Sequence, residues 1–213
     1  MTLLYLLDIA SVAVFALTGA LVASRSQLDI VGFIFVACLT AVGGGTIRDV
    51  LLNRDAVFWV ADPSILLAAV LAAVAVFFNA HRLESRYRAL IWLDAFALAV
   101  AVPAGVGVAM GLGHDWPIIL VMGVITGVFG GLMRDVVCNE VPLVLKQGEI
   151  YATAAFAGAL AAVVALWAGL GQREGLLICA VVTWILRAGS IGLSWRLPVY
   201  KSTPPRADAP KQK

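Results

Sequence analysis

Seven long stretches of this chain are almost free of charged residues, and they constrain its fold more than any other feature. A helix needs about 20 mostly apolar residues to cross the hydrocarbon core of a bilayer. Six of the stretches carry no charge, and the seventh is interrupted only by Arg187. We therefore predict an all-α transmembrane protein with seven helices: Ile9–Ser24, Ile30–Ile47, Pro63–Ala80, Ala95–Gly113, Trp116–Met133, Ile150–Gln172 and Gly175–Trp195.

The composition supports a membrane protein and gives no sign of an enzyme. Of the 213 residues, 62% are hydrophobic and only 13% are charged, whereas soluble domains carry about 25% charged residues. The net charge of +2 is too small to indicate binding to nucleic acid. No nucleophile lies beside a plausible base, and no residues have the spacing of a metal site. We expect no enzymatic activity, no cofactor and no bound metal other than a permeant ion.

The basic residues outside the spans predict the orientation, because cytoplasmic loops are rich in Lys and Arg. One side would carry only Arg54 and Arg173. The other would carry Arg25, Arg82, Arg86, Arg88, Lys146, Arg196, Lys201, Arg206, Lys211 and Lys213. We predict that this second side is cytoplasmic, with the N-terminus outside and the C-terminus inside. The turn with Arg82, Arg86 and Arg88 is a candidate contact for anionic lipid headgroups.

The sequence repeats itself when it is shifted by 86 positions. Leu7-Asp8 aligns with Leu93-Asp94, and Gly44-Gly45 aligns with Gly130-Gly131. The shared pattern G-G-x-x-R-D-V-x-x-N is too long to arise by chance between two alanine-rich helices. Three spans per copy is an odd number, so the second copy must enter the membrane from the opposite face, as in many transporters.

The repeat predicts a domain organisation of two inverted three-helix units followed by one extra helix. The first unit covers residues 1–81 and the second covers residues 82–172. The extra helix covers 173–196. A Pro- and Lys-containing cytoplasmic tail, 197–213, should be disordered.

Glycines cluster in the middle of the second span of each unit, as Gly43-Gly44-Gly45 and Gly130-Gly131. Glycine costs roughly 1 kcal/mol relative to alanine inside a helix, which favours a kink or an unwound turn. Freed backbone groups are tolerated at this depth only against protein or a water-filled cavity. We expect a hydrated path where the second and fifth helices unwind. The alternative is close helix packing through small residues.

Charged residues follow each glycine cluster, as Arg48-Asp49 and Arg134-Asp135. Charges inside a membrane are costly, so they must face the protein interior and find partners. Adjacent residues on a helix point in different directions, which argues against pairing within each Arg-Asp step. We predict instead the pairs Asp8–Arg48 and Asp94–Arg134, one on each side of the midplane. Such pairs could be structural, could act as gates, or both.

A third charge, Arg187, lies in the last span and is a candidate gating charge.

The doubled motif identifies a family. G-G-G-T-I-R-D-V-L-L (Gly43–Leu52) and G-G-L-M-R-D-V-V (Gly130–Val137), in two copies of three spans with a seventh added, resemble the prokaryotic trimeric intracellular cation channels. The same family is also labelled as glycine transporters. The resemblance covers roughly Leu3 to Trp195. The second copy has Phe129 in place of a third glycine.

The resemblance implies a homotrimer in the inner membrane of a prokaryote, with one pore per protomer. The pore would pass between the kinked second and fifth helices and conduct potassium or sodium. The pore-lining residues carried over by motif are Gly43, Gly44, Gly45, Arg48, Asp49, Gly130, Gly131, Arg134 and Asp135. A carrier for a small zwitterion such as glycine, and a scaffold without transport, remain alternatives.

Overall fold

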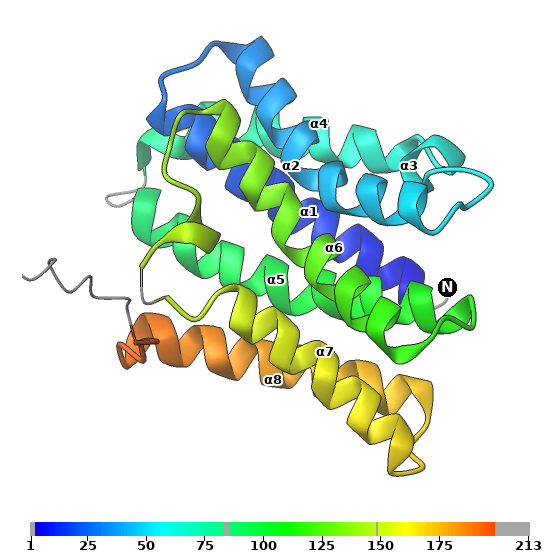
Figure 1. Ribbon diagram of the computed structural model, residues 1–213. Helices are drawn as coiled ribbons and strands as arrows, with labels where there is room; N and C mark the ends of the chain where they lie inside the picture. The colour runs from blue at the N-terminus through cyan, green and yellow to red at the C-terminus, as the bar shows by residue number, and fades with distance from the viewer. Residues whose placement is uncertain (1–2, 83–85, 148, 199–213) are drawn as a thin grey trace, which may run out of the picture.

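The computed structural model describes residues 3–82, 86–147 and 149–198, and this part of the chain is almost entirely helical (Figure 1). The α-helices are α1 (Leu3–Arg25), α2 (Ile30–Leu51), α3 (Phe58–Ala61), α4 (Ser64–Asn79), α5 (Arg86–Gly111), α6 (Trp116–Val137), α7 (Ala152–Trp167) and α8 (Gln172–Gly192). Two short 3-10 helices, η1 (Ala80–Arg82) and η2 (Leu143–Leu145), follow α4 and α6. The predicted disordered tail lies outside the described residues from position 199 onward.

Within the described residues, six helices are long and apolar enough to cross a membrane: α1, α2, α4 with its 3-10 turn, α5, α6 and α8. Helix α7 has 16 residues, which span about 24 Å at 1.5 Å per residue, against a hydrocarbon core of about 30 Å. Every predicted window overlaps an observed helix. The chain is a multi-pass, all-helical membrane protein, while the seventh crossing stays a prediction.

The two helices that carry the repeated motif end in the same way. The last residue of the motif is Asn53 after α2 and Asn139 after α6, and both have a positive φ, 49° and 54°. Asparagine tolerates this left-handed conformation, which commonly ends a helix. In each copy the next backbone N–H turns back to the helix, from Arg54 to Asp49 O (3.0 Å) and from Glu140 to Asp135 O (2.8 Å).

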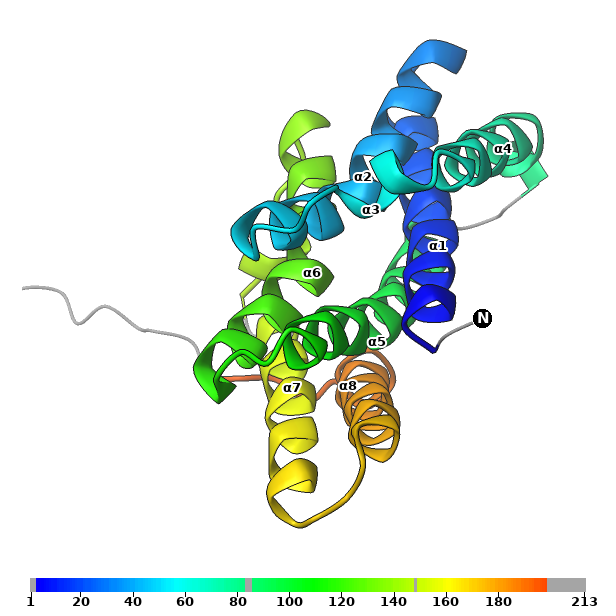
Figure 2. The ribbon, with the colours of Figure 1, turned by 90° about the vertical axis from the view of Figure 1, so that its right-hand side faces the viewer.

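Helix α5 occupies the middle of the molecule, between α1 on one side and α8 on the other (Figure 2). Its buried face is rich in small residues such as Ala97 and Ala101, and α1 presents Ala16, Ala20 and Ala23. Small side chains let helix backbones approach closely, which is the usual packing of membrane helices. The centre of the bundle therefore holds its shape by close helix contact.

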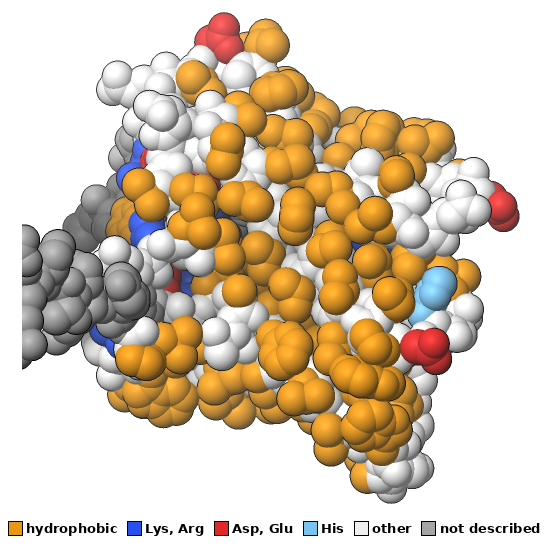
Figure 3. Space-filling view, in the orientation of Figure 1, with side chains coloured by type: hydrophobic (Ala, Val, Ile, Leu, Met, Phe, Trp, Pro, Cys, Tyr) orange, Lys and Arg blue, Asp and Glu red, His pale blue; other side chains and the backbone are white. Residues whose placement is uncertain are grey.

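The outer surface is apolar over the length of the helices, as the face in Figure 3 shows. Large exposed side chains there include Val121 on α6 and Phe156 and Val164 on α7. A soluble protein rarely exposes a continuous apolar surface of this kind. The surface is that expected of a protein that faces lipid or other membrane helices.

Candidate functional site

The first ion-pair cluster forms where α2 ends against α1. The side chain of Arg48 is 0% exposed, and its Nη1 lies 2.8 Å from Asp8 Oδ1. Its Nε lies 2.7 Å from Asp49 Oδ1, and its guanidinium carbon lies 5.4 Å from the centre of the Phe58 ring. Two carboxylates and an aromatic face thus compensate one buried cation.

Asp49 also fixes the chain that follows α2. Its Oδ1 accepts a second hydrogen bond, from Arg54 Nη1 at 3.2 Å, and its Oδ2 accepts the backbone N–H of Phe58 at 2.8 Å. The carboxylate therefore holds the start of α3 beneath Arg48. Asp49 is a buried anchor in this conformation.

The second cluster repeats this arrangement at the end of α6. Arg134 is also 0% exposed, with Nη1 at 2.9 Å from Asp94 Oδ1 and Nε at 2.7 Å from Asp135 Oδ1. Asp135 Oδ2 accepts the backbone N–H of Leu143, the first residue of η2, at 2.9 Å. Each copy therefore closes its helix end with one arginine, one distant aspartate and one adjacent aspartate.

Both predicted pairs, Asp8–Arg48 and Asp94–Arg134, are present. The expectation that Arg48 and Arg134 would not contact the aspartate that follows each of them is wrong. The two side chains do leave the helix in different directions, but the long arginine side chain brings its Nε back over the neighbouring carboxylate. Each arginine consequently binds two carboxylates.

The two clusters differ in solvent access and in charge. The side chain of Asp8 is 15% exposed, whereas that of Asp94 is 0% exposed. Arg54, beside the first cluster, corresponds to Glu140 in the second copy, and Glu140 lies 3.2 Å from Arg25 instead. The first cluster thus holds two arginines against two aspartates, and the second holds one arginine against two.

A hydroxyl group adds a further contact to the second cluster. Thr18 Oγ1 of α1 lies 3.0 Å from Arg134 Nη1 and is buried. The residue of α5 that corresponds to Thr18 is Ala104, which has no polar side chain. Thr18 lies 10 residues after Asp8 on α1, so the two clusters are about 15 Å apart along that helix.

The glycines of α2 and α6 meet in a reciprocal crossing. A Cβ atom at Gly44 would overlap the carbonyl oxygen of Thr126, and a Cβ at Gly130 would overlap the carbonyl oxygen of Thr40. Gly130 follows Gly44 by 86 positions, and Thr126 follows Thr40 by the same interval. The two backbones can approach this closely only because glycine has no side chain.

Helices α2 and α6 remain continuous through their glycines. The prediction of unwound turns is therefore wrong, since the glycines serve close packing, which leaves the helical hydrogen bonds in place. A kink at these positions stays a prediction. At the crossing the two helices are in direct backbone contact.

The flanking glycines are covered by side chains. A Cβ at Gly43 would overlap the Met133 methyl group, and one at Gly45 would lie 2.6 Å from the Phe58 ring. A Cβ at Gly131 would lie 3.3 Å from Tyr151 Oη and 3.5 Å from Asp94 Oδ1. The first glycine cluster is thus capped by hydrophobic groups, and Gly131 faces the second ion-pair cluster.

A cavity of about 340 Å³ reaches the first cluster from the end of α1 where the chain begins, and its lining includes Asp8, Arg54, Phe58 and Asp62. Hydrogen bonds from Ser64 and Tyr5 lower the pKa of Asp62 below its usual value. The lining of the cavity therefore includes a carboxylate that stays ionised at neutral pH.

Arg187 lies in α8, apart from both arginine motifs, and stacks on Tyr151 with its guanidinium carbon 4.7 Å from the ring centre. Tyr151 is buried beside the second cluster. Sequence reasoning singled out Arg187 but missed Tyr151, Thr18 and Phe58.

Within the described ranges, no group of three or more His, Cys, Asp or Glu side chains could hold a metal ion.

A family model described as a glycine transporter matches the chain twice, at residues 5–81 and 91–167. The two matches begin 86 positions apart, which is the offset between the two ion-pair clusters. The inner membrane protein YadS of Escherichia coli K12, a UPF0126 protein, is 38% identical over 93% of this chain and 96% of its own length. A UPF0126 membrane protein of Vibrio cholerae is 38% identical over 95% of this chain and 84% of its own length.

Solved structures with the same fold are described as cation channels. The trimeric intracellular cation channel orthologue of Rhodobacter sphaeroides is 42% identical, with a TM-score of 0.87 over 91% of this chain and all of its own. A second structure, from work on conductance through these channels, is 29% identical with a TM-score of 0.83, over 93% of this chain and 97% of its own.

Proposed function

The chain belongs to the family of membrane proteins called UPF0126 or glycine transporters, which includes the trimeric intracellular cation channels, and from this premise we propose that it is a channel for monovalent cations. Potassium and sodium are the proposed permeant ions. Each protomer of a homotrimer would hold its own pore. The protein would lie in the inner membrane, with its N-terminus outside and its C-terminus in the cytoplasm.

One observation carries the proposed pathway: a sealed glycine crossing lies between two ion-pair clusters that repeat the same contacts. We infer that the pore runs between α2 and α6, past Gly43, Gly44 and Gly45 on one helix and Gly130 and Gly131 on the other. Opening would require the two helices to separate at the crossing. Arg48, Asp49, Arg134 and Asp135 would then face the path.

The charges of the clusters suit a cation pathway once the arginines are compensated. A bare arginine would repel a cation, but each one here binds two aspartates within 2.9 Å. The second cluster has one carboxylate more than it has arginines. Movement of Arg48 or Arg134 away from its aspartates would expose carboxylate oxygens, which attract cations.

The two ends of the proposed path differ in solvent exposure, and this difference indicates which end is closed. Asp8 is partly exposed to the cavity beside α3, whereas Asp94 is fully buried. We infer that the closed gate lies at the second cluster, where Tyr151 and Thr18 add to the seal. Arg187 would sense or influence that gate through its contact with Tyr151.

A carrier for glycine is the second candidate, supported by the same asymmetry. A path that is reachable from one end and sealed at the other is also what one state of an alternating-access carrier presents. Arg48 would then bind the carboxylate of the substrate. The ion pairs themselves do not separate the two functions.

Current recordings from planar bilayers that contain the purified protein, under a potassium chloride gradient, distinguish the channel from the carrier. We expect unitary currents that reverse near the potassium equilibrium potential. Silent bilayers, together with saturable uptake of glycine into proteoliposomes, would replace the channel by the carrier. A variant in which Arg48 and Arg134 are both neutralised tests the third alternative, a scaffold without transport. For a scaffold, the stability of the variant would change, and neither the variant nor the wild type would show ion flux.

A further inference from the structure

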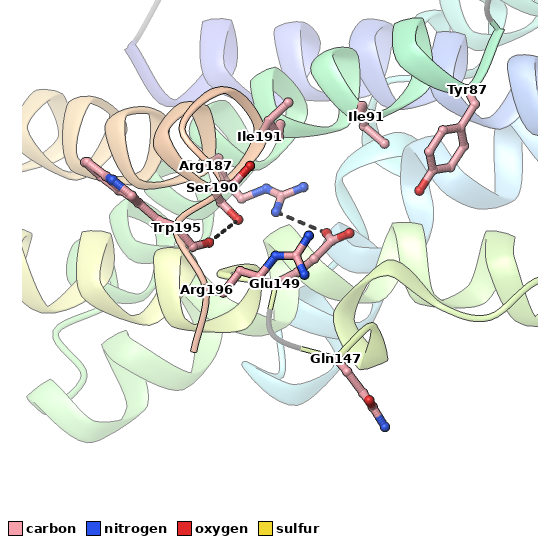
Figure 4. Close-up of a pocket in the computed structure, with 10 residues that line it drawn as sticks. Tyr87, Ile91, Gln147, Glu149, Arg187, Ser190, Ile191, Trp195 and Arg196 are labelled. Carbon is pink, nitrogen blue, oxygen red and sulfur yellow. Dashed lines mark hydrogen bonds and ion pairs between the residues drawn. The ribbon is translucent and has the colours of Figure 1, made fainter. Parts of the chain in front are cut away.

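A cavity of about 280 Å³ lies beside the far end of α8, outside the proposed pathway. The cavity is bounded by α5, by the chain around Glu149 and by the chain that follows α8 (Figure 4). Glu149 and Arg196 pair as an isolated antiparallel bridge, which ties these two segments together. Its polar lining includes Tyr87, Glu149, Arg187, Ser190 and Arg196. The cavity is thus enclosed by segments that are joined to each other, and its lining carries charged side chains.

Arg187 lacks the partners that the other buried arginines have. Its side chain is 0% exposed, and its Nη1 makes two long contacts, 3.3 Å to Ile150 O and 3.5 Å to Glu149 Oε2. Its Nε and Nη2 are buried and have no hydrogen-bond partner among the described residues. A buried donor without an acceptor costs about 1–3 kcal/mol, and more when it is charged. Two donors of Arg187 are therefore left without an acceptor, although this residue lines the cavity.

Two guanidinium groups converge on this space. Figure 4 shows the side chains of Arg187 and Arg196 turned toward the same region, with the Glu149 carboxylate beside them. Two arginines against one glutamate leave the lining with a net positive charge. Arginine binds phosphate and similar oxyanions through two parallel N–H bonds, which its planar group presents in a fixed geometry. Ser190 Oγ adds a hydroxyl group to the same wall.

We propose that this cavity binds a phosphate-type oxyanion, held by Arg187 and Arg196 and displacing Glu149 from its long contact with Arg187. The ion can come from a soluble phosphate compound or from the phosphate of a lipid headgroup. Once Glu149 has moved aside, a tetrahedral oxyanion supplies acceptors to the Arg187 guanidinium, whose Nε and Nη2 have none among the described residues. The bound charge would lie one side chain away from Tyr151, on which Arg187 stacks.

Thermal unfolding and titration calorimetry of the detergent-solubilised protein test this site with inorganic phosphate as the probe. Sodium chloride at matched ionic strength corrects for general screening. We expect a saturable rise in Tm with phosphate. Arg196→Gln should weaken phosphate binding about tenfold, the loss of one charge-assisted contact. Glu149→Gln should tighten binding, because it removes the competing carboxylate.

Arg173→Gln is the matched control, since Arg173 lies at the opposite end of the same helix and is exposed. Its phosphate affinity should equal that of the wild type. A parallel titration with short-chain phosphatidylglycerol, set against the zwitterionic phosphatidylcholine of the same chain length, identifies the source. Stronger binding of phosphatidylglycerol than of inorganic phosphate indicates a lipid headgroup, and the reverse indicates a soluble ion.

The proposal is overturned if neither probe raises Tm beyond the chloride control, or if Arg196→Gln and Glu149→Gln both bind phosphate like the wild type. These measurements do not depend on ion conduction. A failed anion site would therefore leave the channel proposal standing, and the converse also holds.

Discussion

Gly130 of α6 lies directly against the carbonyl oxygen of Thr40 in α2, so closely that a residue with a Cβ atom would not fit at position 130. Gly44 makes the same approach to Thr126 from the other helix. The crossing is therefore reciprocal, and both of its contacts involve backbone atoms that cannot move aside as a flexible side chain could.

Gly130→Ala should lower stability and push the two helices apart. Alanine gains up to about 1 kcal/mol of helix propensity, but overpacking a tight contact costs about 1–3 kcal/mol. We expect a lower Tm in detergent and a higher open probability in bilayers. Gly111→Ala is the control, because a Cβ there has nothing within 4 Å. A Tm for Gly130→Ala at or above that of Gly111→Ala would contradict the packing described.

The ion pair between Asp94 and Arg134 should show a coupling energy in a double-mutant cycle. Arg134→Gln leaves Asp94 and Asp135 buried without a cation, which costs about 3–5 kcal/mol, whereas Asp94→Asn leaves Arg134 paired with Asp135 and should cost less. We expect the double variant to lose less than the sum, with a coupling of about 1–3 kcal/mol measured by chemical unfolding.

The cycle of Asp8→Asn with Arg134→Gln is its control, since these residues belong to different clusters. Their effects should add within about 0.5 kcal/mol. Equal coupling in the two cycles would show that long-range charge, and not the contact at 2.9 Å, sets the energy. On conductance, Asp8→Asn should resemble Arg48→Gln, and unrelated effects would remove that pair from the mechanism.

The ion pairs could be foreseen from the sequence because the repeat supplied them. Asp8 and Asp94 occupy the same position in the two copies, as do Arg48 and Arg134, and a buried charge needs a partner. The role of the glycines could not be settled in the same way. A glycine cluster weakens a helix and also lets another helix approach, and only the position of Thr40 and Thr126 opposite it decides between the two outcomes.

Contacts that occur in only one of the two copies could not be predicted from the sequence, for a related reason. Arg134 binds Thr18 across 116 positions of sequence, and nothing in the local pattern of either residue points to the other. Phe58 begins α3, a helix of four residues, which is too short to leave a periodic signal. Tyr151 directly precedes α7, and nothing in the sequence around it points to Gly131 or Asp94.

Tyr151→Phe should weaken the proposed gate with little loss of stability. The hydroxyl group lies beside Gly131 and the second cluster. Loss of a buried hydrogen bond of this kind typically lowers the free energy of unfolding by about 1 kcal/mol. We expect a small drop in Tm and a higher open probability. Ile65→Val is the control, because Ile65 is buried and lines the cavity beside the first cluster, and it should leave gating unchanged. Identical gating in Tyr151→Phe and the wild type would place the gate elsewhere.

The number of membrane crossings can be read from the sides on which introduced cysteines react. The native cysteines Cys38, Cys138 and Cys179 carry free thiols, so each is first replaced by alanine. Asp62→Cys, before α4, and Glu140→Cys, after α6, should then react with a membrane-impermeant thiol reagent from opposite sides. Three helices, α4, α5 and α6, lie between these positions, and an odd number of crossings exchanges the sides.

Arg173→Cys, in the first turn of α8, decides whether α7 is a further crossing. With 16 residues, α7 is shorter than the other spans, but its helix is strongly apolar and local thinning of the bilayer costs only fractions of a kcal/mol per Å. We therefore expect the thiol at position 173 to react on the same side as the thiol at position 62. Reaction on the side of position 140 would reduce the count to six, and would place both ends of the described chain on one side of the membrane.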